Sequence, residues 1–276
     1  MKFSKVLLML GVLIIMIFNV NTKCIKCEEV QPELSEYKSN IKKKAFLTFD
    51  DGPSPEVTLD IIKVLKKNQV KGSFFIIGSR AEEYPHIIEE LVNNEMSVCI
   101  HSYSHKYEDI YKSVNDYIED LKKCEEVIKK HVKGDVSRYV RMPGGSFGSI
   151  KSKAMLKEIK EAIVDNDFKY IDWNVPSDDT QERYVSQDLI FRNIKKNVKG
   201  KNTAIILMHD SKYKKTSAKV LQRVIDYLRE EGYEFYCMDD ITEEDEMLLI
   251  KSRIINNGVG VTSEFTHIKD YEPKVE

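Results

Sequence analysis

The sequence predicts an α/β fold in which helices pack outside a mainly parallel sheet. Between about residue 44 and residue 238, short apolar runs alternate with amphipathic helical patterns about seven times, which is typical of repeated strand–helix units. This alternation suits either a (β/α) barrel or an open doubly wound sheet. No glycine-rich phosphate loop follows the first apolar run, which argues against the nucleotide-binding members of these folds.

The predicted strands are runs of β-branched, aromatic and other apolar residues: 45–49, 72–77, 97–100, 138–142, 168–175, 203–208 and 233–237. The predicted helices carry apolar residues three or four positions apart: 56–67, 85–94, 113–132, 151–166, 186–198 and 217–231. Local signals support two of these boundaries. Pro85 suits the first turn of its helix, and the turn residues Pro143-Gly144-Gly145 are expected to end the fourth strand.

The N-terminus is predicted to carry an export signal. Lys2 and Lys5 precede an uninterrupted apolar run over residues 6–18, which is typical of a secretory signal. The run is shorter than the ~20 residues of a full membrane span. We therefore predict an exported protein, extracellular or associated with the cell wall, with residues 1–23 as a signal peptide or a retained membrane anchor. No clear cleavage site follows, so both fates of the segment stay open.

The rest of the chain is predicted to hold one main domain. Residues 24–43 are polar and charged and form a linker, residues 44–240 form the α/β domain, and residues 241–276 form a C-terminal extension. Thr242 and Asp245 are spaced to cap a helix that would run to about residue 256. The extension is therefore predicted to be partly helical.

Composition narrows the expected partners. An apolar fraction of 42% supports a packed core, and a formal charge of −2 provides no basic field for nucleic acid. We expect a monomer that binds no nucleic acid and meets a membrane only through its N-terminal segment. Five cysteines cannot form a complete disulfide framework. Cys24 and Cys27 have no second Cys-x-x-Cys to complete a zinc site, and Cys99 and Cys237 lie in apolar runs that predict burial.

Reactive side chains gather where the predicted strands end. In chain order they are Asp50 and Asp51, His101 and His105, Arg141, Asp178 and Asp179, and His209 and Asp210. The carboxyl ends of parallel strands meet at one edge of the sheet, and α/β folds build their active sites there. Scattered surface charges would show no such preference. The sequence therefore predicts that these residues share one site.

His101 and His105 are spaced so that one helical turn would place both imidazoles on the same side, which is a common way to bind a metal. One added carboxylate would complete a two-His, one-carboxylate site for catalytic zinc or non-haem iron. The second aspartate could then act as a general base, with Arg141 holding it ionised, and His209 could protonate a leaving group. Each feature also has a simpler interpretation. The two aspartates could form a solvated acidic turn, and the spacing of the two histidines could be a matter of chance. Arg141 could form an ordinary salt bridge, and His209 could be a strand-end histidine whose hydrogen bonds are satisfied.

The motifs together resemble those of the polysaccharide deacetylase family, the NodB homology domain of carbohydrate esterase family 4. The resemblance covers about residues 43–238 and rests on five short motifs in the family's order: TFDDGP at 48–53, HSYSH at 101–105, RMP at 141–143, WNVPSDD at 173–179 and LMH at 207–209. It implies a distorted (β/α) barrel and metal-dependent removal of N-acetyl groups from amino sugars.

Carried over position by position, the resemblance implies a role for each of ten residues: Asp51, His101 and His105 as metal ligands, Asp50 as base, Arg141 as the residue that tunes the base, His209 as acid, Asp179 as the residue that orients the acid, Gly144 as donor of a backbone N–H to the oxyanion, and Leu207 and Trp173 as substrate-binding walls. The expected metal is zinc, with cobalt, nickel or manganese as alternatives. The base would take a proton from the attacking water, and the acid would protonate the departing amine.

The sequence departs from the family's usual residues around this site. Cys99-Ile100 replaces a common Gly-Asn pair, and Gly144 replaces a common tyrosine, which would open that wall of the groove. Thr180 stands where a tryptophan is common and Asp178 where a glycine is common. None of these changes removes a proposed ligand, base or acid. We therefore expect an active enzyme with an altered substrate groove.

The expected substrate is an N-acetylated glycan, and export favours cell-wall peptidoglycan. Whether N-acetylglucosamine or N-acetylmuramic acid is deacetylated stays open. The first alternative is hydrolysis of an O-acetyl ester or another amide on a different glycan. The second is a catalytically silent protein that binds the cell wall.

Overall fold

The structure, a computed structural model, describes residues 42–148 and 152–259. The predicted signal or anchor segment, almost all of the predicted linker, Cys24, Cys27 and the last part of the C-terminal extension lie outside the described residues. Within the described ranges, no helix combines the length and the apolar character needed to cross a membrane.

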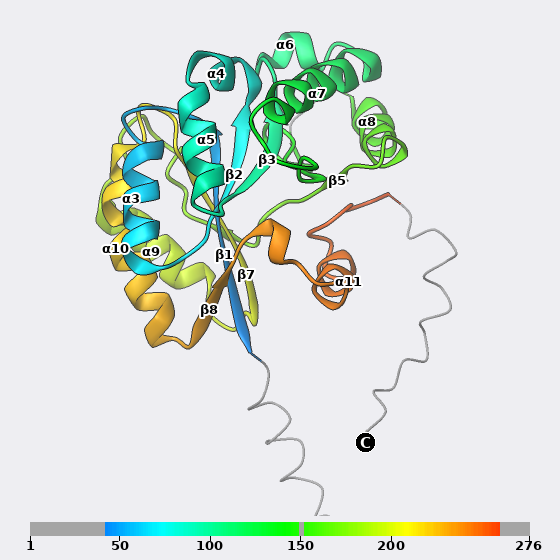
Figure 1. The fold of residues 1–276 in the computed structure, drawn as a ribbon. Coiled ribbons are helices and arrows are strands. Elements are labelled where there is room, and N and C mark those ends of the chain that lie inside the picture. Colours follow the sequence, from blue (N-terminus) through cyan, green and yellow to red (C-terminus); the bar gives the residue numbers. More distant parts are fainter. Residues whose placement is uncertain (1–41, 149–151, 260–276) are drawn as a thin grey trace, which may run out of the picture. The chain divides into compact units, whose positions relative to one another are not determined.

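Strands and helices alternate along the chain (Figure 1). The strands are β1 Lys43–Gly52, β2 Ser73–Ile77, β3 Ser97–Ser102, β4 Tyr139–Val140, β5 Lys169–Tyr170, β6 Val175–Pro176, β7 Thr203–His209 and β8 Tyr233–Tyr236. The helices are α3 Thr58–Asn68, α4 Gly78–Glu83, α5 Pro85–Asn93, α6 Tyr107–Ile110, α7 Val114–Lys129, α8 Lys153–Asp165, α9 Gln187–Asn197, α10 Lys215–Glu230 and α11 Glu243–Lys251, with a 3-10 turn at Met238–Asp240. Short α4 and α6 were not predicted.

The strands form one parallel sheet in the order β5-β4-β3-β2-β1-β7-β6, which confirms the predicted α/β class with a distorted barrel. β1 is the central strand: residues 44–50 pair with β7, while β8 and β2 pair with its first and second halves. The two edge strands, β5 and β6, are joined by only residues 171–174. This short connection brings the two edges of the sheet close together, as a barrel requires.

The alternation of side chains along β1 builds two apolar clusters. Ala45, Leu47 and Phe49 pack in the larger cluster, which includes the buried faces of the helices. Phe46 packs in a second cluster with inward-facing residues of the neighbouring strands, including Phe75 and Cys99. Thr48 and Asp50 continue the same inward face toward the end of β1, and both are buried. The barrel interior is therefore apolar near the start of β1 and polar near its end.

The predicted fifth strand is interrupted, because the chain changes its pairing partner within it. Ile171 N–H donates to Val140 O in β4, whereas Asn174 N–H donates to Ile205 O in β7. Between these two residues, Asp172 N–H donates to Ile254 O in the C-terminal segment. Trp173 therefore lies in a connector between the sheet edges rather than inside a strand.

The C-terminal extension packs against the barrel over its described part. Thr242 and Asp245 form the predicted capping box of α11, but the helix ends at Lys251 instead of near residue 256. Arg253 adopts a left-handed conformation (φ 60°), which a continuing helix does not allow. Asp245 also pairs with Lys44 at the start of β1 at 2.7 Å. Leu249, Ile254 and Ile255 complete the inner apolar cluster.

The cysteines within the described ranges, Cys99, Cys124 and Cys237, are free and buried. Burial raises the pKa of the Cys124 thiol to about 12 and that of the Cys237 thiol to about 11. The burial of Cys99 and Cys237 agrees with the apolar runs around them.

Candidate active site

A pocket of about 350 Å³ lies where the strands end at their carboxyl edge. Eight of the ten predicted site residues line it: Asp50, Asp51, His101, His105, Gly144, Trp173, Leu207 and His209. The other two, Arg141 and Asp179, are buried and do not line the pocket. Arg141 pairs with Asp50, and Asp179 pairs with His209. The structure therefore brings together residues from distant parts of the sequence, between Asp50 and His209.

A bulge at the end of β1 lets two consecutive aspartates face the same pocket. Successive side chains of a strand point to opposite faces, so Asp51 would normally point away from the side that Asp50 faces. The pairing between β1 and β2 shifts register between Asp50 and Gly52, and Asp51 has a φ of 76°. Such a bulge redirects one side chain. Both carboxylates consequently line the pocket.

Gly52 and Asp210 pack against each other next to this bulge. A Cβ at Gly52 would lie only 2.1 Å from Asp210 Oδ2, so the turn needs a residue without a side chain. Thr58 Oγ donates to Asp210 Oδ2 at 2.6 Å, and Ser54 Oγ donates to the Asp210 carbonyl at 2.7 Å. Burial raises the pKa of Asp210 to about 7. Asp210 thus supports the turn that carries the two aspartates and does not line the pocket.

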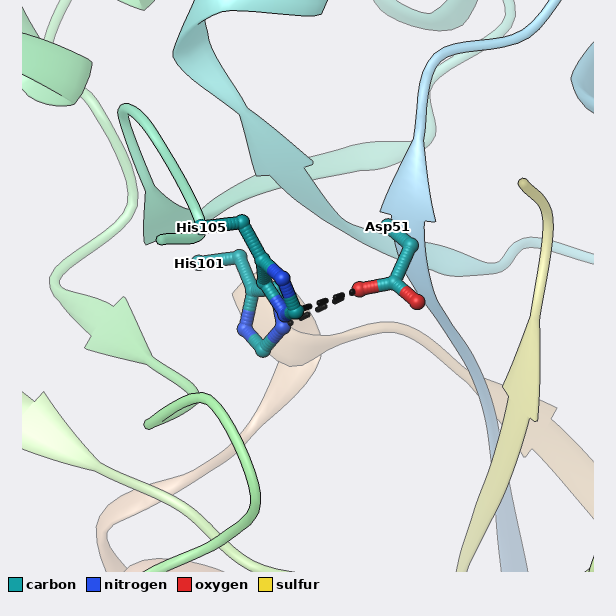
Figure 2. Close-up of side chains that lie close together, drawn as sticks. All are labelled: Asp51, His101 and His105. Atoms are coloured by element: carbon teal, nitrogen blue, oxygen red, sulfur yellow. Dashed lines mark ion pairs between the residues drawn. The ribbon is translucent and has the colours of Figure 1, made fainter. Parts of the chain in front are cut away.

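Asp51, His101 and His105 converge on one point (Figure 2). The Nε2 atoms of both histidines lie 3.3 Å from Asp51 Oδ1. His101 Nδ1 lies 2.6 Å from the Arg141 carbonyl, so Nδ1 carries a proton and Nε2 is the ring nitrogen available to a metal. Although burial alone would raise it, the hydrogen bond and charge of His101, with the charges of His209 and His105, hold the pKa of Asp51 well below its usual range.

This donor set fits a divalent metal. Two imidazoles and one carboxylate with open positions are typical of a catalytic zinc site. The three candidate ligand atoms lie within 4.8 Å of one another, and this is the one such group among the residues that the structure describes.

The two histidines do not lie on a helical turn, so that part of the prediction is wrong. His101 belongs to β3, and the chain bends through Tyr103 and Ser104 before reaching His105. His105 has a φ of 53°, and its N–H donates to Ser102 Oγ at 2.8 Å. A strand end followed by a tight bend therefore replaces the expected helical geometry.

Asp120 of α7 holds this bend, and the sequence did not reveal it. Its carboxylate accepts hydrogen bonds from Ser102 Oγ at 2.6 Å, Tyr103 N–H at 2.7 Å and Ser104 N–H at 2.9 Å. These three donors lie between the two histidines in the chain. In the sequence, Asp120 is one polar residue among many on an amphipathic helix, so no local pattern marks it.

Replacing Asp120 with alanine is expected to weaken metal binding by about 10- to 100-fold, the usual cost of losing a group that orients metal ligands. The affinity for zinc can be measured by competition with a chromogenic chelator. Glu119→Ala is the matched control, because Glu119 is an exposed acid on the same helix. Equal zinc affinity in Asp120→Ala and the control would show that the bend holds its shape without Asp120.

Arg141 and Asp50 form a buried ion pair. Arg141 Nη1 donates to Asp50 Oδ1 at 2.9 Å and to Thr48 Oγ at 2.6 Å. Its Nε donates to the Ile171 carbonyl at 3.2 Å, and the guanidinium lies 4.1 Å from the centre of the Phe75 ring. Arg141 is fully buried, so these contacts hold it in one orientation. Arg141 thereby orients the Asp50 carboxylate, which lines the pocket, from its buried side.

His209 and Asp179 form the second polar pair. Asp179 Oδ1 lies 2.7 Å from His209 Nδ1, and Asp179 Oδ2 accepts from the His209 N–H at 2.9 Å and from Ser217 Oγ at 2.6 Å. Burial alone would lower the pKa of His209, but the charge and hydrogen bond of Asp179 raise it to about 9. His209 is therefore held protonated near neutral pH, and Ser217 is a supporting residue that the sequence did not indicate.

The wall at Gly144 is not open, contrary to what its missing side chain suggested. The Tyr107 hydroxyl lies 3.0 Å from the place that a Cβ of Gly144 would occupy. The Tyr107 ring also meets the His105 ring edge-on, with centroids 5.5 Å apart. A tyrosine from α6 thus fills space next to Gly144 and lines the pocket. Thr180 lines it as well, but Asp178 does not.

Comparisons with known proteins agree with this geometry. Residues 37–164 match the family model described as Polysaccharide deacetylase. A Bacillus cereus protein named Peptidoglycan-N-acetylglucosamine deacetylase is 28% identical over 204 residues, 73% of this chain and 71% of the relative. Bacillus subtilis PdaA, a Peptidoglycan-N-acetylmuramic acid deacetylase, is 30% identical over 218 residues, 77% of each.

A solved structure is similar as well. It is the catalytic domain of peptidoglycan N-acetylglucosamine deacetylase from Eubacterium rectale, with a TM-score of 0.66 and 30% sequence identity. The match covers 72% of this chain and 90% of that one.

Proposed function

Because this chain belongs to the polysaccharide deacetylase family and is an enzyme of that kind, we propose that it is a metal-dependent hydrolase that removes N-acetyl groups from the amino sugars of cell-wall peptidoglycan. The observation that carries this proposal is the meeting of three groups in one pocket: the Asp51–His101–His105 cluster, the Asp50–Arg141 pair and the His209–Asp179 pair. The names of the curated relatives support the substrate class.

Asp51, His101 and His105 would hold the metal, with zinc as the first candidate. A divalent ion there would supply Lewis acidity, which makes a water more acidic and polarises the carbonyl oxygen of an acetamide. His101 is prepared for this role, because its Nδ1–H is already engaged by the Arg141 carbonyl.

Asp50 would act as the general base and take a proton from the attacking water. Arg141, which also donates to Thr48 Oγ, keeps the Asp50 carboxylate oriented toward the pocket. Attack on the acetamide carbon forms the C–O bond, and the backbone N–H of Gly144 would stabilise the resulting oxyanion. The C–N bond then breaks as His209 donates its proton to the amine nitrogen. The products are acetic acid and a free amino sugar. The protons of Asp50 and of the acetic acid are then released, which restores the Asp50 carboxylate and protonates His209 and the amine.

Exposed aromatic side chains in segments that follow the carboxyl ends of the strands favour a polymeric substrate. Tyr107, Phe147, Tyr184 and Tyr213 are large and exposed, and each lies in a segment that follows the carboxyl end of a strand. Aromatic faces are suitable surfaces for the apolar faces of sugar rings. The apolar N-terminal run, which suggests export, is consistent with a substrate in the cell wall.

Mass spectrometry of peptidoglycan fragments, recorded before and after exposure to the zinc-loaded protein, tests the proposal. Each deacetylation removes one acetyl group, and fragmentation shows which of the two sugars lost it. Parallel assays on acetylated xylan separate amide hydrolysis from ester hydrolysis. Failure to release acetate from any N-acetylated glycan would refute the proposed activity.

The alkaline limit of activity is expected to depend on Asp179. A general acid works while it is protonated, so activity should fall as the pH rises through the pKa of His209, which Asp179 holds at about 9. Asp179→Asn removes the charge and should shift this limit down by roughly 1–2 pH units. The check is the kcat profile from pH 6 to 10; an unchanged alkaline limb would show that His209 is not the acid.

A further inference from the structure

We propose that Asp172 is a positioning residue, which holds the loop of residues 143–148 and the Gly144 N–H in place through two hydrogen bonds with Ser146. The inference rests on the proposed function, because it concerns the backbone donor expected to stabilise the oxyanion. Neither Asp172 nor Ser146 lines the pocket, and neither has a role in the proton transfers described above.

The contact between Asp172 and Ser146 is buried, and it involves both hydrogen-bond donors of the serine. Asp172 is 3% exposed and Ser146 is 1% exposed. Asp172 Oδ1 accepts from the Ser146 N–H at 2.8 Å, and Asp172 Oδ2 accepts a short hydrogen bond from the Ser146 hydroxyl. A carboxylate is an acceptor only, so it satisfies both donors of the serine at once.

A carboxyl group in this place is costly unless it is well paired. Burial raises the pKa of Asp172, while the hydrogen bonds from Ser146 and the charge of Arg141 act in the opposite direction. Arg141 also approaches the Asp172 carbonyl, at 3.4 Å from Nη2. The connector between β5 and β6 therefore has two contacts: its Asp172 side chain holds Ser146 of the loop, and its backbone accepts hydrogen bonds from Arg141.

The loop needs an external anchor, because its own residues restrict it little. Gly144 and Gly145 both have left-handed conformations, with φ of 81° and 78°. Glycine is the residue with the largest conformational freedom to lose. Two local backbone hydrogen bonds are present: the Gly145 N–H donates to the carbonyl of Met142, just before the loop, at 2.8 Å, and the Gly148 N–H donates to the Gly145 carbonyl at 3.0 Å. Ser146 supplies a side chain by which a distant segment, the connector that carries Asp172, holds this glycine turn.

The loop also packs against Trp173 and Tyr111, so a small displacement of the loop would change the wall of the pocket. A Cβ at Gly145 would lie 2.8 Å from Trp173 Cη2. The Tyr111 hydroxyl donates to the Pro143 carbonyl at 2.7 Å. Asp172 is next to Trp173 in the chain, so a single connector both anchors the loop and forms the surface beneath it.

Asp172→Ala and Ser146→Ala are expected to lower kcat by roughly 10- to 100-fold with little change in KM, somewhat less than complete removal of an oxyanion donor. Bound zinc should stay at the wild-type level, because neither residue touches Asp51, His101 or His105. The double variant should lose little more than Asp172→Ala alone, since both changes break the same contact. Asp172→Asn should recover part of the loss, because its amide oxygen still accepts from the Ser146 N–H.

The single tryptophan of the chain supplies a measurement that does not depend on activity. Trp173 packs beneath Gly145, so a loosened loop should make its fluorescence more easily quenched by acrylamide. Ser97→Ala is the matched control: Ser97 is a buried serine whose Oγ accepts from the Asp239 N–H at 3.0 Å, at the amino end of β3. If Asp172→Ala does not fold, Ser146→Ala and Asp172→Asn carry the test.

Two results would overturn the proposal. One is quenching of Trp173 in Ser146→Ala and Asp172→Asn equal to that of wild type and Ser97→Ala. The other is a loss of activity that matches only the loss of folded protein or of bound zinc. An inactive wild-type enzyme would refute the proposed function instead, and the quenching measurement would still decide whether Asp172 holds the loop.

Discussion

Replacing Asp51 with alanine is expected to abolish metal binding and turnover together. Asp51 is the carboxylate of the candidate metal site, and its Oδ1 lies 3.3 Å from the Nε2 atoms of both His101 and His105. Without it, two neutral imidazoles remain, which hold a divalent cation far less tightly. Metal ions contribute several kcal/mol to the transition state of such reactions, so the rate should fall by ~10³-fold or more.

Elemental analysis of the purified variant after exposure to zinc measures this prediction directly. Asp109→Ala is a suitable control, because Asp109 is an exposed acid on α6, close to His105 in the chain. The control should keep both zinc and activity. An Asp51→Ala protein that still binds one zinc with wild-type affinity would show that the ligands are different residues.

Replacing the neighbouring Asp50 with asparagine is expected to leave metal binding intact but to cause a comparable loss of rate. The amide has nearly the same shape and can still accept a hydrogen bond from Arg141 Nη1, so the pocket and the bound metal should be kept. It cannot take a proton from water. General-base catalysis typically contributes about 10²- to 10⁴-fold, and kcat should fall by that factor.

The stability of Asp50→Asn must be measured beside its activity. Arg141 is fully buried and would lose its charged partner, and breaking a buried ion pair is often destabilising by about 3–5 kcal/mol. The assay should therefore be run well below the melting temperature, which circular dichroism provides. Wild-type turnover in a folded, zinc-loaded Asp50→Asn enzyme would exclude Asp50 as the base.

Asp50 and His209 show how far the sequence alone could lead. Both were placed at the ends of predicted strands, and they are Cα partners in the pairing of β1 with β7. This agreement has a simple cause. The carboxyl ends of parallel strands must meet at one edge, so a reactive residue at each strand end is carried to the same site whatever the details of packing.

The local shape of the metal site could not be predicted in the same way. The spacing of His101 and His105 fits a helical turn, but the structure places them on a strand end and a bend that Asp120 holds. Asp51 reaches the pocket because β1 bulges, and a bulge depends on the pairing of two strands. Spacing within one segment does not contain either piece of information.

The interrupted fifth strand has the same explanation. Residues 168–175 read as one strand because they are largely apolar and β-branched or aromatic. The structure divides them because Ile171 bonds to β4, Asn174 bonds to β7 and Asp172 bonds to Ile254 of the C-terminal segment. These partners come from three distant parts of the chain.

By itself, the sequence determined the α/β class, the edge of the sheet that carries the site, the residue types gathered there and the family to which the chain belongs. These follow from local periodicity and from short motifs, which are written in consecutive residues. Only the tertiary structure decided how Asp51 turns into the pocket, which residues hold the histidine bend and the glycine loop, and what fills the space beside Gly144. Those depend on contacts such as Asp172 with Ser146 and Tyr107 with Gly144, which join segments with no pattern in common.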